Sequence, residues 1–180
     1  MGSKTHLLLT ATQLPAIKTH HFSNHDPNLD VFEALRASKA IPGAYGKRVN
    51  IQGTDYIDGD ISTSLADNIR TATSLGCKNV IAISTSNSMI SADHIGIAIQ
   101  CLQDPQARAA IVKRIGKKLQ KPQPPAKGSN VMTLRPKQKL PTRTLNNTPE
   151  AVAKSHKQGV FDTMDSRELN DFFDRKAKAV

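Results

Sequence analysis

The most informative stretch of this sequence reads Ala34-Leu35-Arg36-Ala37-Ser38-Lys39-Ala40-Ile41-Pro42-Gly43, and Tyr56-Ile57-Asp58-Gly59-Asp60 follows it closely. The first run predicts a helix of small residues, which can lie close to neighbouring backbone and which Pro42-Gly43 must end. The second run predicts a strand that ends in an acidic turn, where Gly59 permits a positive φ. Catalytic groups of α/β proteins tend to lie at strand ends, which makes Asp58 a candidate functional residue, although from these residues alone a turn aspartate that bonds its own backbone is the favoured interpretation.

Local signals on both sides of this stretch predict the neighbouring elements. Asp30 caps a helix that runs through Ala40, and Glu33 completes a capping-box-like pattern. Further along, the predicted elements are a hairpin of residues 47–52 and 55–57 around Gly53-Thr54, a helix over 64–75 with Gly76 as its C-cap, and a strand over 79–84. This last strand is apolar on both faces, which predicts a covered strand in a parallel sheet. Strand, helix and strand in this order predict a βαβ unit and therefore an α/β sheet.

Shorter patterns predict the remaining segments. They are strands over residues 4–12, 16–22 and 131–135, and helices over 90–119 in two pieces, from Thr148-Pro149 to about Val160, and over 166–177. We therefore divide the chain into a core portion (residues 1–120), a proline-rich linker (121–130) and a C-terminal strand with helices (131–180).

The length and composition exclude several classes of protein. The chain has 180 residues, enough for one core, and it has no apolar run of about 18 residues that could cross a membrane. The first residues lack the apolar core of a signal peptide. Nothing in the sequence indicates a disulfide between Cys77 and Cys101, which favours free thiols in a reducing compartment. We therefore expect the protein in the cytoplasm, either free there or in peripheral contact with a membrane. The histidines offer no metal-ligand spacing, so we expect no metal and no other cofactor.

A basic run marks the middle of the chain, whose formal net charge is +10. No acidic residue interrupts it, and its members are Lys113, Arg114, Lys117, Lys118, Lys121 and Lys127. Such a patch attracts the phosphates of an anionic lipid surface or of nucleic acid. No aromatic residue is interleaved to stack on bases, so nucleic acid is the disfavoured ligand. A solvated helix end followed by a linker is the plainest interpretation.

Taken together, the runs 34–43 and 56–59 resemble the patatin-like phospholipase family. The shared pattern is A-L-R-A-S-x-A-I-P-G, a short hairpin, then Y-I-D-G followed by a helix and a hydrophobic strand. The resemblance covers most of the chain but matches only the later portion of the family's domain. It implies the C-terminal portion of a three-layer α/β/α domain of the bacterial type. It also implies hydrolysis of a carboxylic ester bond in a phospholipid or other acyl lipid, and thus a function in lipid degradation.

By the resemblance, Asp58 would be the proton acceptor of a Ser-Asp dyad, and Gly59 would form the motif turn beside it. The aspartate in such a dyad accepts the serine proton directly, without a histidine or a metal. Asp60 is a departure, because the family has Gly or Ala there, and its carboxylate could crowd the serine or point to solvent. The competing interpretation of Asp58 is a turn residue that bonds its own backbone. Arg36 is assigned a structural contact between helix and sheet.

The sequence shows only half of this dyad. It contains no Gly-x-Ser-x-Gly and no glycine-rich run to form an oxyanion hole, so the chain alone should be nearly inert as an esterase. Three explanations compete: a truncated or split product of a longer gene, a second polypeptide that carries the serine half, or a non-catalytic descendant that binds lipid or protein. A half-domain would also expose the edge of its buried strand at Leu7–Ala11, which predicts aggregation or dimerisation.

The alternative function belongs to an unrelated class of protein. It is a non-catalytic basic adaptor that binds anionic lipid, a protein partner or nucleic acid through residues 113–127. The hydrolase interpretation predicts a preference for lipid or acyl-ester ligands, whereas the adaptor interpretation predicts salt-sensitive binding that does not depend on Asp58.

Overall fold

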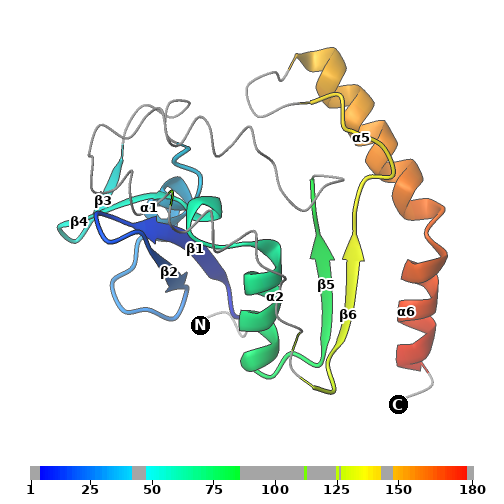
Figure 1. Ribbon diagram of the computed structural model, residues 1–180, viewed down its shortest axis with the longest axis horizontal. Coiled ribbons are helices and arrows are strands. Elements are labelled where there is room, and N and C mark those ends of the chain that lie inside the picture. Colours follow the sequence, from blue (N-terminus) through cyan, green and yellow to red (C-terminus); the bar gives the residue numbers. More distant parts are fainter. Residues whose placement is uncertain are drawn as a thin grey trace. The chain divides into compact units, whose positions relative to one another are not determined.

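The computed structural model describes residues 5–41, 48–85, 112, 125, 127–142 and 148–177 (Figure 1). Its helices and strands are β1 (Leu8–Gln13), β2 (Lys18–Ser23), α1 (Val31–Ser38), β3 (Val49–Ile51), β4 (Thr54–Asp58), the 3-10 helix η1 (Gly59–Ile61), α2 (Leu65–Ser74), β5 (Asn79–Ile83), β6 (Asn130–Leu134), α5 (Pro149–Met164) and α6 (Arg167–Ala177). Helices and strands are thus both present, as the predicted α/β class requires. None of the helices in these ranges is both long and apolar enough to cross a membrane.

The described residues belong to two compact units. Residues 5–41 and 48–64 lie in the first unit, and residues 65–85, 127–142 and 148–177 lie in the second. The predicted helix over 90–119, except residue 112, most of the basic run and half of the linker lie outside the described residues. The division of the chain at residues 120 and 130 therefore stays a prediction.

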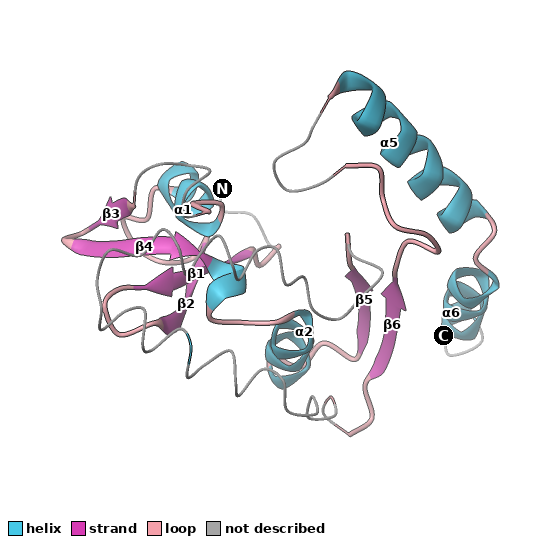
Figure 2. Ribbon diagram, turned by 45° about the horizontal axis from the view of Figure 1, so that its top comes forward, coloured by secondary structure: helices cyan, strands magenta, loops and turns pink. Residues whose placement is uncertain are grey.

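A four-stranded antiparallel sheet with the order β2-β1-β4-β3 forms the centre of the first unit (Figure 2). β1 pairs with β2 along its whole length, from Leu8↔Ser23 to Gln13↔Lys18. On its other side it pairs with the end of β4, from Ala11↔Asp58 to Gln13↔Tyr56. The predicted strands over 4–12 and 16–22 are confirmed. The prediction that the first strand lacks neighbours is wrong, because a partner strand lies on each side of β1.

The β3–β4 hairpin is confirmed, with its turn one residue earlier than predicted. Gln52 and Gly53 form the two-residue loop, and both have positive φ, +52° and +81°. Positive φ at both loop residues is the geometry that matches the twist of paired strands. The Asn50 side chain closes the turn, because its Oδ1 accepts from Gly53 N at 3.1 Å and its Nδ2 donates to Asp55 Oδ1 at 2.8 Å.

Helix α1 packs on one face of this sheet through alanines. Asp30 caps it as predicted and accepts hydrogen bonds from the backbone N–H groups of Phe32 and Glu33. The buried cluster that joins the helix to the sheet comprises Ala11, Phe22, Ala34, Ala37, Ala40, Val49 and Tyr56. Arg36, to which a contact between helix and sheet is assigned above, has an exposed side chain whose guanidinium pairs with Glu33 at 2.6 Å. The small side chains allow the close approach that the run 34–43 predicted.

In the second unit, β5 and β6 pair in parallel, from Asn79↔Asn130 to Ile83↔Leu134. Helix α2 contacts β5, and α6 contacts β6. The predicted βαβ unit is wrong, because β4 and β5 lie in different sheets. The parallel direction predicted for β5 is right, but the strand is not covered, since Ile81 is 39% and Ile83 71% exposed. An apolar run predicts a buried strand only when another element covers it.

The ends of the helices follow the local signals closely. Gly76, at φ +92°, ends α2, and the Cys77 N–H donates to the Ala72 carbonyl at 3.1 Å. Thr148 caps α5, with Pro149 in its first turn, and the Ser166 hydroxyl accepts from Leu169 N at the start of α6. The thiol of Cys77 is free and exposed, as predicted, whereas Cys101 lies outside the described residues.

Candidate functional site

Asp58 is the last residue of β4 and the N-cap of η1. Its N–H donates to the Ala40 carbonyl at 3.0 Å, and its own carbonyl accepts from the Thr12 hydroxyl at 2.7 Å. Its Oδ1 accepts from Asp60 N at 2.8 Å. The backbone of Asp58 is therefore hydrogen-bonded to Ala40, which belongs to the run 34–43. Thr12 of β1 also binds the Asp58 backbone.

Gly59 is required in this turn for a reason that differs from the predicted one. Its φ is not in the positive range in which glycine is favoured. Instead, Gly59 is buried against β1, and a Cβ atom at this position would lie 2.9 Å from the carbonyl carbon of Thr10 and closer still to its oxygen. Real Cβ atoms do not approach backbone so closely. The turn after Asp58 can therefore form in this position only because residue 59 has no side chain.

A buried group of hydroxyls lies under the turn. The side chains of Thr12 and Ser62 are 0% and 1% exposed, and their oxygens are 2.8 Å apart. Thr19 joins them from β2, since its hydroxyl donates to the Ser62 carbonyl and lies 3.1 Å from Ser62 Oγ. Buried polar groups need such partners, and a satisfied network makes one geometry strongly preferred.

Sequence reasoning missed these hydroxyls, although a signal existed. Thr10 and Thr12 alternate with Leu9 and Ala11 in the middle of β1, so the two faces of the strand differ there. Period-2 alternation of this kind indicates a strand with two different faces, not a strand buried between apolar layers. The apolar face meets α1, and the threonines support η1.

The carboxylate of Asp58 already has a structural role. It accepts a hydrogen bond from Asp60 N, which is the interaction expected of a turn aspartate. The interpretation of Asp58 as a turn residue that bonds nearby backbone therefore describes its geometry correctly. The Ala40 carbonyl and the Thr12 hydroxyl, from two other segments, are hydrogen-bonded to its backbone. These contacts fix where the residue stands at the end of β4. Asp60 is exposed and lies on the solvent side of the turn.

Histidines are concentrated near β2, and their contacts are structural. His6 Nε2 lies 2.8 Å from Ser23 Oγ, and His21 Nδ1 lies 3.1 Å from Thr10 Oγ1. His20 lies against Phe22 and Tyr56, with ring centroids 4.4 and 5.3 Å away. Burial lowers the pKa of His20, although the nearby Asp26 opposes this shift. The described residues hold no group of three or more metal-ligating side chains.

Two of the described serines make structural contacts in the first unit. Ser62 is buried among the hydroxyls of Thr12 and Thr19. The hydroxyl of Ser23 is hydrogen-bonded to His6 Nε2 and accepts from the backbone N–H of His25. Ser86 and Ser88 lie outside the described residues. Comparison of the chain with protein-family models, with curated proteins and with solved structures gave no match.

Proposed function

We propose that this chain provides the aspartate-bearing part of a Ser-Asp lipid acyl hydrolase, with Asp58 as the proton acceptor. The finer proposal for the fold is the C-terminal portion of a patatin-like three-layer domain. One observation supports the function above all, the hydrogen bond from Asp58 N to the Ala40 carbonyl. It brings the A-I-P-G run and the Asp-Gly turn together at a strand end, where the resemblance requires the carboxylate.

The proposed reaction needs a serine that this sequence does not offer in a Gly-x-Ser-x-Gly context. The Asp58 carboxylate takes the proton of that serine while the serine oxygen attacks the ester carbonyl of an acyl lipid. The alcohol leaves with the proton, and an acyl-serine forms. A water molecule then attacks the acyl-serine and gives its proton to Asp58, which returns it to the serine oxygen as the fatty acid leaves.

The donors that stabilise the oxyanion also have to come from the serine-bearing part. The described residues contain no glycine-rich run that could supply them, and loss of such donors costs orders of magnitude in rate. Under this proposal the chain alone hydrolyses no ester at a rate above background. Activity requires assembly with a polypeptide that carries the serine.

A reconstitution experiment tests the proposal. The DNA upstream of the Met1 codon is searched for a Gly-x-Ser-x-Gly reading frame, that polypeptide is produced, and the two chains are mixed. We expect turnover of p-nitrophenyl butyrate and of phosphatidylcholine by the mixture and not by either chain alone. Asp58→Asn should abolish this turnover, while Asp60→Asn, its matched control on the solvent side of the turn, should retain it.

Two results would contradict the proposal. Turnover by the mixture that survives Asp58→Asn would remove the role of the carboxylate. The absence of any serine-bearing reading frame, together with an inert chain, would leave the dyad without its nucleophile and would favour a binding function.

A further inference from the structure

The 3-10 helix η1 is joined at both ends to a single hydroxyl group of β1. Asp58 is the residue before η1, and Ser62 is the residue after it. Thr12 Oγ1 donates to the Asp58 carbonyl at 2.7 Å and lies 2.8 Å from Ser62 Oγ. The Thr12 side chain therefore connects the two residues that flank this turn, from a strand 46 residues before Asp58 in the sequence.

The acceptors of this group of hydroxyls determine where its hydrogens lie. A carbonyl oxygen only accepts and a hydroxyl has one hydrogen, so Thr12 gives its hydrogen to the Asp58 carbonyl. The 2.8 Å contact between Thr12 and Ser62 is then a hydrogen bond in which Ser62 Oγ donates. Thr19 in turn donates to the Ser62 carbonyl at 3.1 Å. The three hydroxyls thus form a directed series that begins on β2 and ends at the Asp58 backbone.

The centre of this series is closed off from water. Thr12 is 0% and Ser62 is 1% exposed. A valine at position 12 would keep nearly the shape of the threonine but would remove its hydroxyl. The Asp58 carbonyl and the Ser62 hydroxyl would then both lose this partner, and solvent could not replace it.

The surroundings of the Asp58 carboxylate depend on the same turn. Asp58 Oδ1 accepts from the N–H of Asp60, which is the middle residue of η1, at 2.8 Å. At the other end, the Ser62 N–H donates to the Gly59 carbonyl at 3.1 Å and closes the turn. A change in the separation of Asp58 and Ser62 therefore moves the Asp60 N–H relative to the carboxylate.

We propose that Thr12 is a positioning residue for the Asp58 carboxylate, and that Thr19 extends this control to β2. Thr12 acts through the backbone of Asp58 and through Ser62, the two ends of the turn. A displacement of β2 reaches the turn through Thr19, although β1 lies between β2 and β4 in the sheet. The catalytic meaning of this control rests on the proposed function, whereas the coupling is a property of this chain alone.

Nuclear magnetic resonance of the full chain tests the coupling at neutral pH. The measured quantity is the rate at which the Asp60 amide hydrogen exchanges with water, since that amide is bonded to the carboxylate. We expect Thr12→Val to raise this rate about tenfold, the factor that corresponds to the loss of one ordinary hydrogen bond. Thr12→Ser keeps the hydroxyl and should leave the rate near that of the wild type. Thr19→Val should raise it less than Thr12→Val, because the Thr19 hydroxyl reaches the turn only through Ser62.

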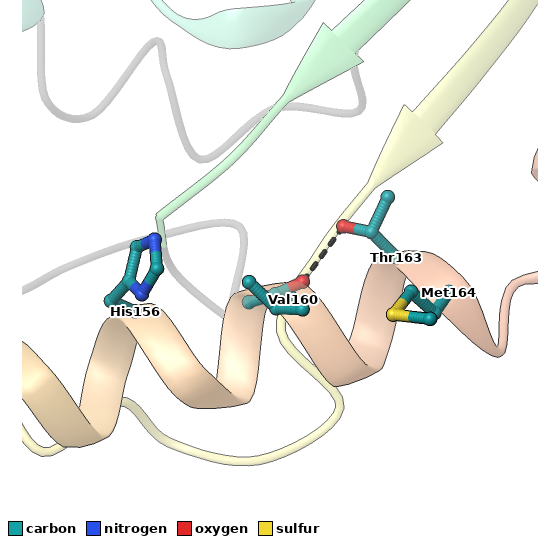
Figure 3. A pocket seen from close by; sticks show the side chains of 5 residues that line it. His156, Val160, Thr163 and Met164 are labelled. Atoms are coloured by element: carbon teal, nitrogen blue, oxygen red, sulfur yellow. Dashed lines mark hydrogen bonds between the residues drawn. The ribbon is translucent and has the colours of Figure 1, made fainter.

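Two other threonines provide matched controls. Thr10→Val removes a hydroxyl of the same strand that lies 3.1 Å from His21 Nδ1. Thr163→Val removes a hydroxyl in α5 that donates to the Gly159 carbonyl at 2.7 Å, beside the shallow pocket shown in Figure 3. Both variants should leave the exchange of the Asp60 amide unchanged.

The Gly53 amide is the internal reference for the stability of the unit. It is bonded to Asn50 Oδ1 at 3.1 Å in the β3–β4 hairpin, away from the hydroxyl series. Equal exchange of the Asp60 amide in wild type and Thr12→Val would overturn the proposal. An increase that Gly53 shares would also overturn it, because Thr12 would then support the whole unit and not the turn. If Thr12→Val does not fold, Thr19→Val decides, and an unchanged Asp60 rate in that variant would overturn the proposal.

Turnover distinguishes this inference from the proposed function. In the reconstituted mixture, Thr12→Val should lower kcat by about tenfold to a hundredfold with little change in KM, and Thr12→Ser should restore most of the rate. If no mixture hydrolyses esters while the exchange rates change as expected, the proposed function fails and the coupling stands. If the exchange rates do not change, the coupling fails whatever the turnover.

Discussion

At the scale of single residues, the turn after Asp58 shows how one missing side chain can determine the position of a carboxylate. Gly59 lies against the backbone of Thr10, and the bonds of Asp58 to Thr12 and Ala40 depend on that approach. Any side chain at residue 59 would push the turn away from β1. The carboxylate would then move even if every residue around it stayed the same.

Gly59→Ala is therefore expected to destabilise the first unit. Forcing a methyl group into this contact should lower the free energy of unfolding by about 1–3 kcal/mol, the usual cost of overpacking. Urea denaturation followed by circular dichroism measures this change. Gly159→Ala is the control, because its Cβ would meet no atom and alanine is the better helix residue. Equal midpoints for wild type and Gly59→Ala would contradict the close packing described here.

His20 should make stability depend on pH. Burial lowers its pKa below 6.5, the coulombic effect of His21 lowers it further, and Asp26 opposes both. The unfolded chain thus binds the proton more readily than the folded chain, so stability is complete above pH 6.5. It falls as the pH drops through 6.5 and levels off below the lowered pKa. Melting temperatures measured between pH 7.5 and 5 should fall more in the wild type than in His20→Gln. Parallel curves would show that His20 is not the cause.

At the scale of helices and strands, end signals in the sequence were reliable. Asp30, Gly76 and Thr148 stand where the structure begins or ends a helix, and the Gln52-Gly53 loop lies one residue from its predicted place. These features depend on residues within one turn of each other, so they can be inferred from a short window. Burial was less predictable, because the apolar strand β5 remains open on the side of Ile83.

Asp30→Ala tests the contribution of such a signal. Loss of the two hydrogen bonds to Phe32 N and Glu33 N should cost about 1 kcal/mol of stability. Glu33→Gln serves as the control, because its ion pair with Arg36 is largely exposed and should contribute under about 1 kcal/mol. Urea denaturation at neutral pH measures both. A cost for Asp30→Ala no larger than that of the control would mean that the cap contributes little to α1.

At the scale of the whole molecule, the pairing of strands that lie far apart in the sequence could not be inferred. β1 pairs with β4 across more than forty residues, and β5 finds its parallel partner in β6 and not in β4. The order strand, helix, strand along the chain predicts a βαβ unit. Neither the local propensities nor the period of the hydrophobic pattern distinguishes such a unit from strands in two separate sheets. The cluster of hydroxyls under the Asp58 turn could not be predicted for the same reason, because Thr12, Thr19 and Ser62 come from three separate segments.

Hydrogen exchange should reveal unequal stability across the chain. Amides of β1 have partner strands on both sides and lie beside the alanine-rich core, so they should exchange most slowly. Amides of α5 should exchange far faster, because no residue of that helix is buried. Exchange followed by mass spectrometry compares peptides from residues 8–13 and 149–164. Equal protection of the two would contradict this view of the second unit.

The parallel pairing of β5 with β6 also bears on the order in which the chain folds. Asn79 and Asn130 face each other across 51 residues of sequence, whereas the β3–β4 hairpin closes over two. Closing a long loop costs entropy before any contact repays it, so non-local pairs form slowly. We therefore expect the hairpin to form early, and the β5–β6 and β1–β4 pairs to form later because both close long loops. Substitutions in β6 should then accelerate unfolding and leave the refolding rate almost unchanged.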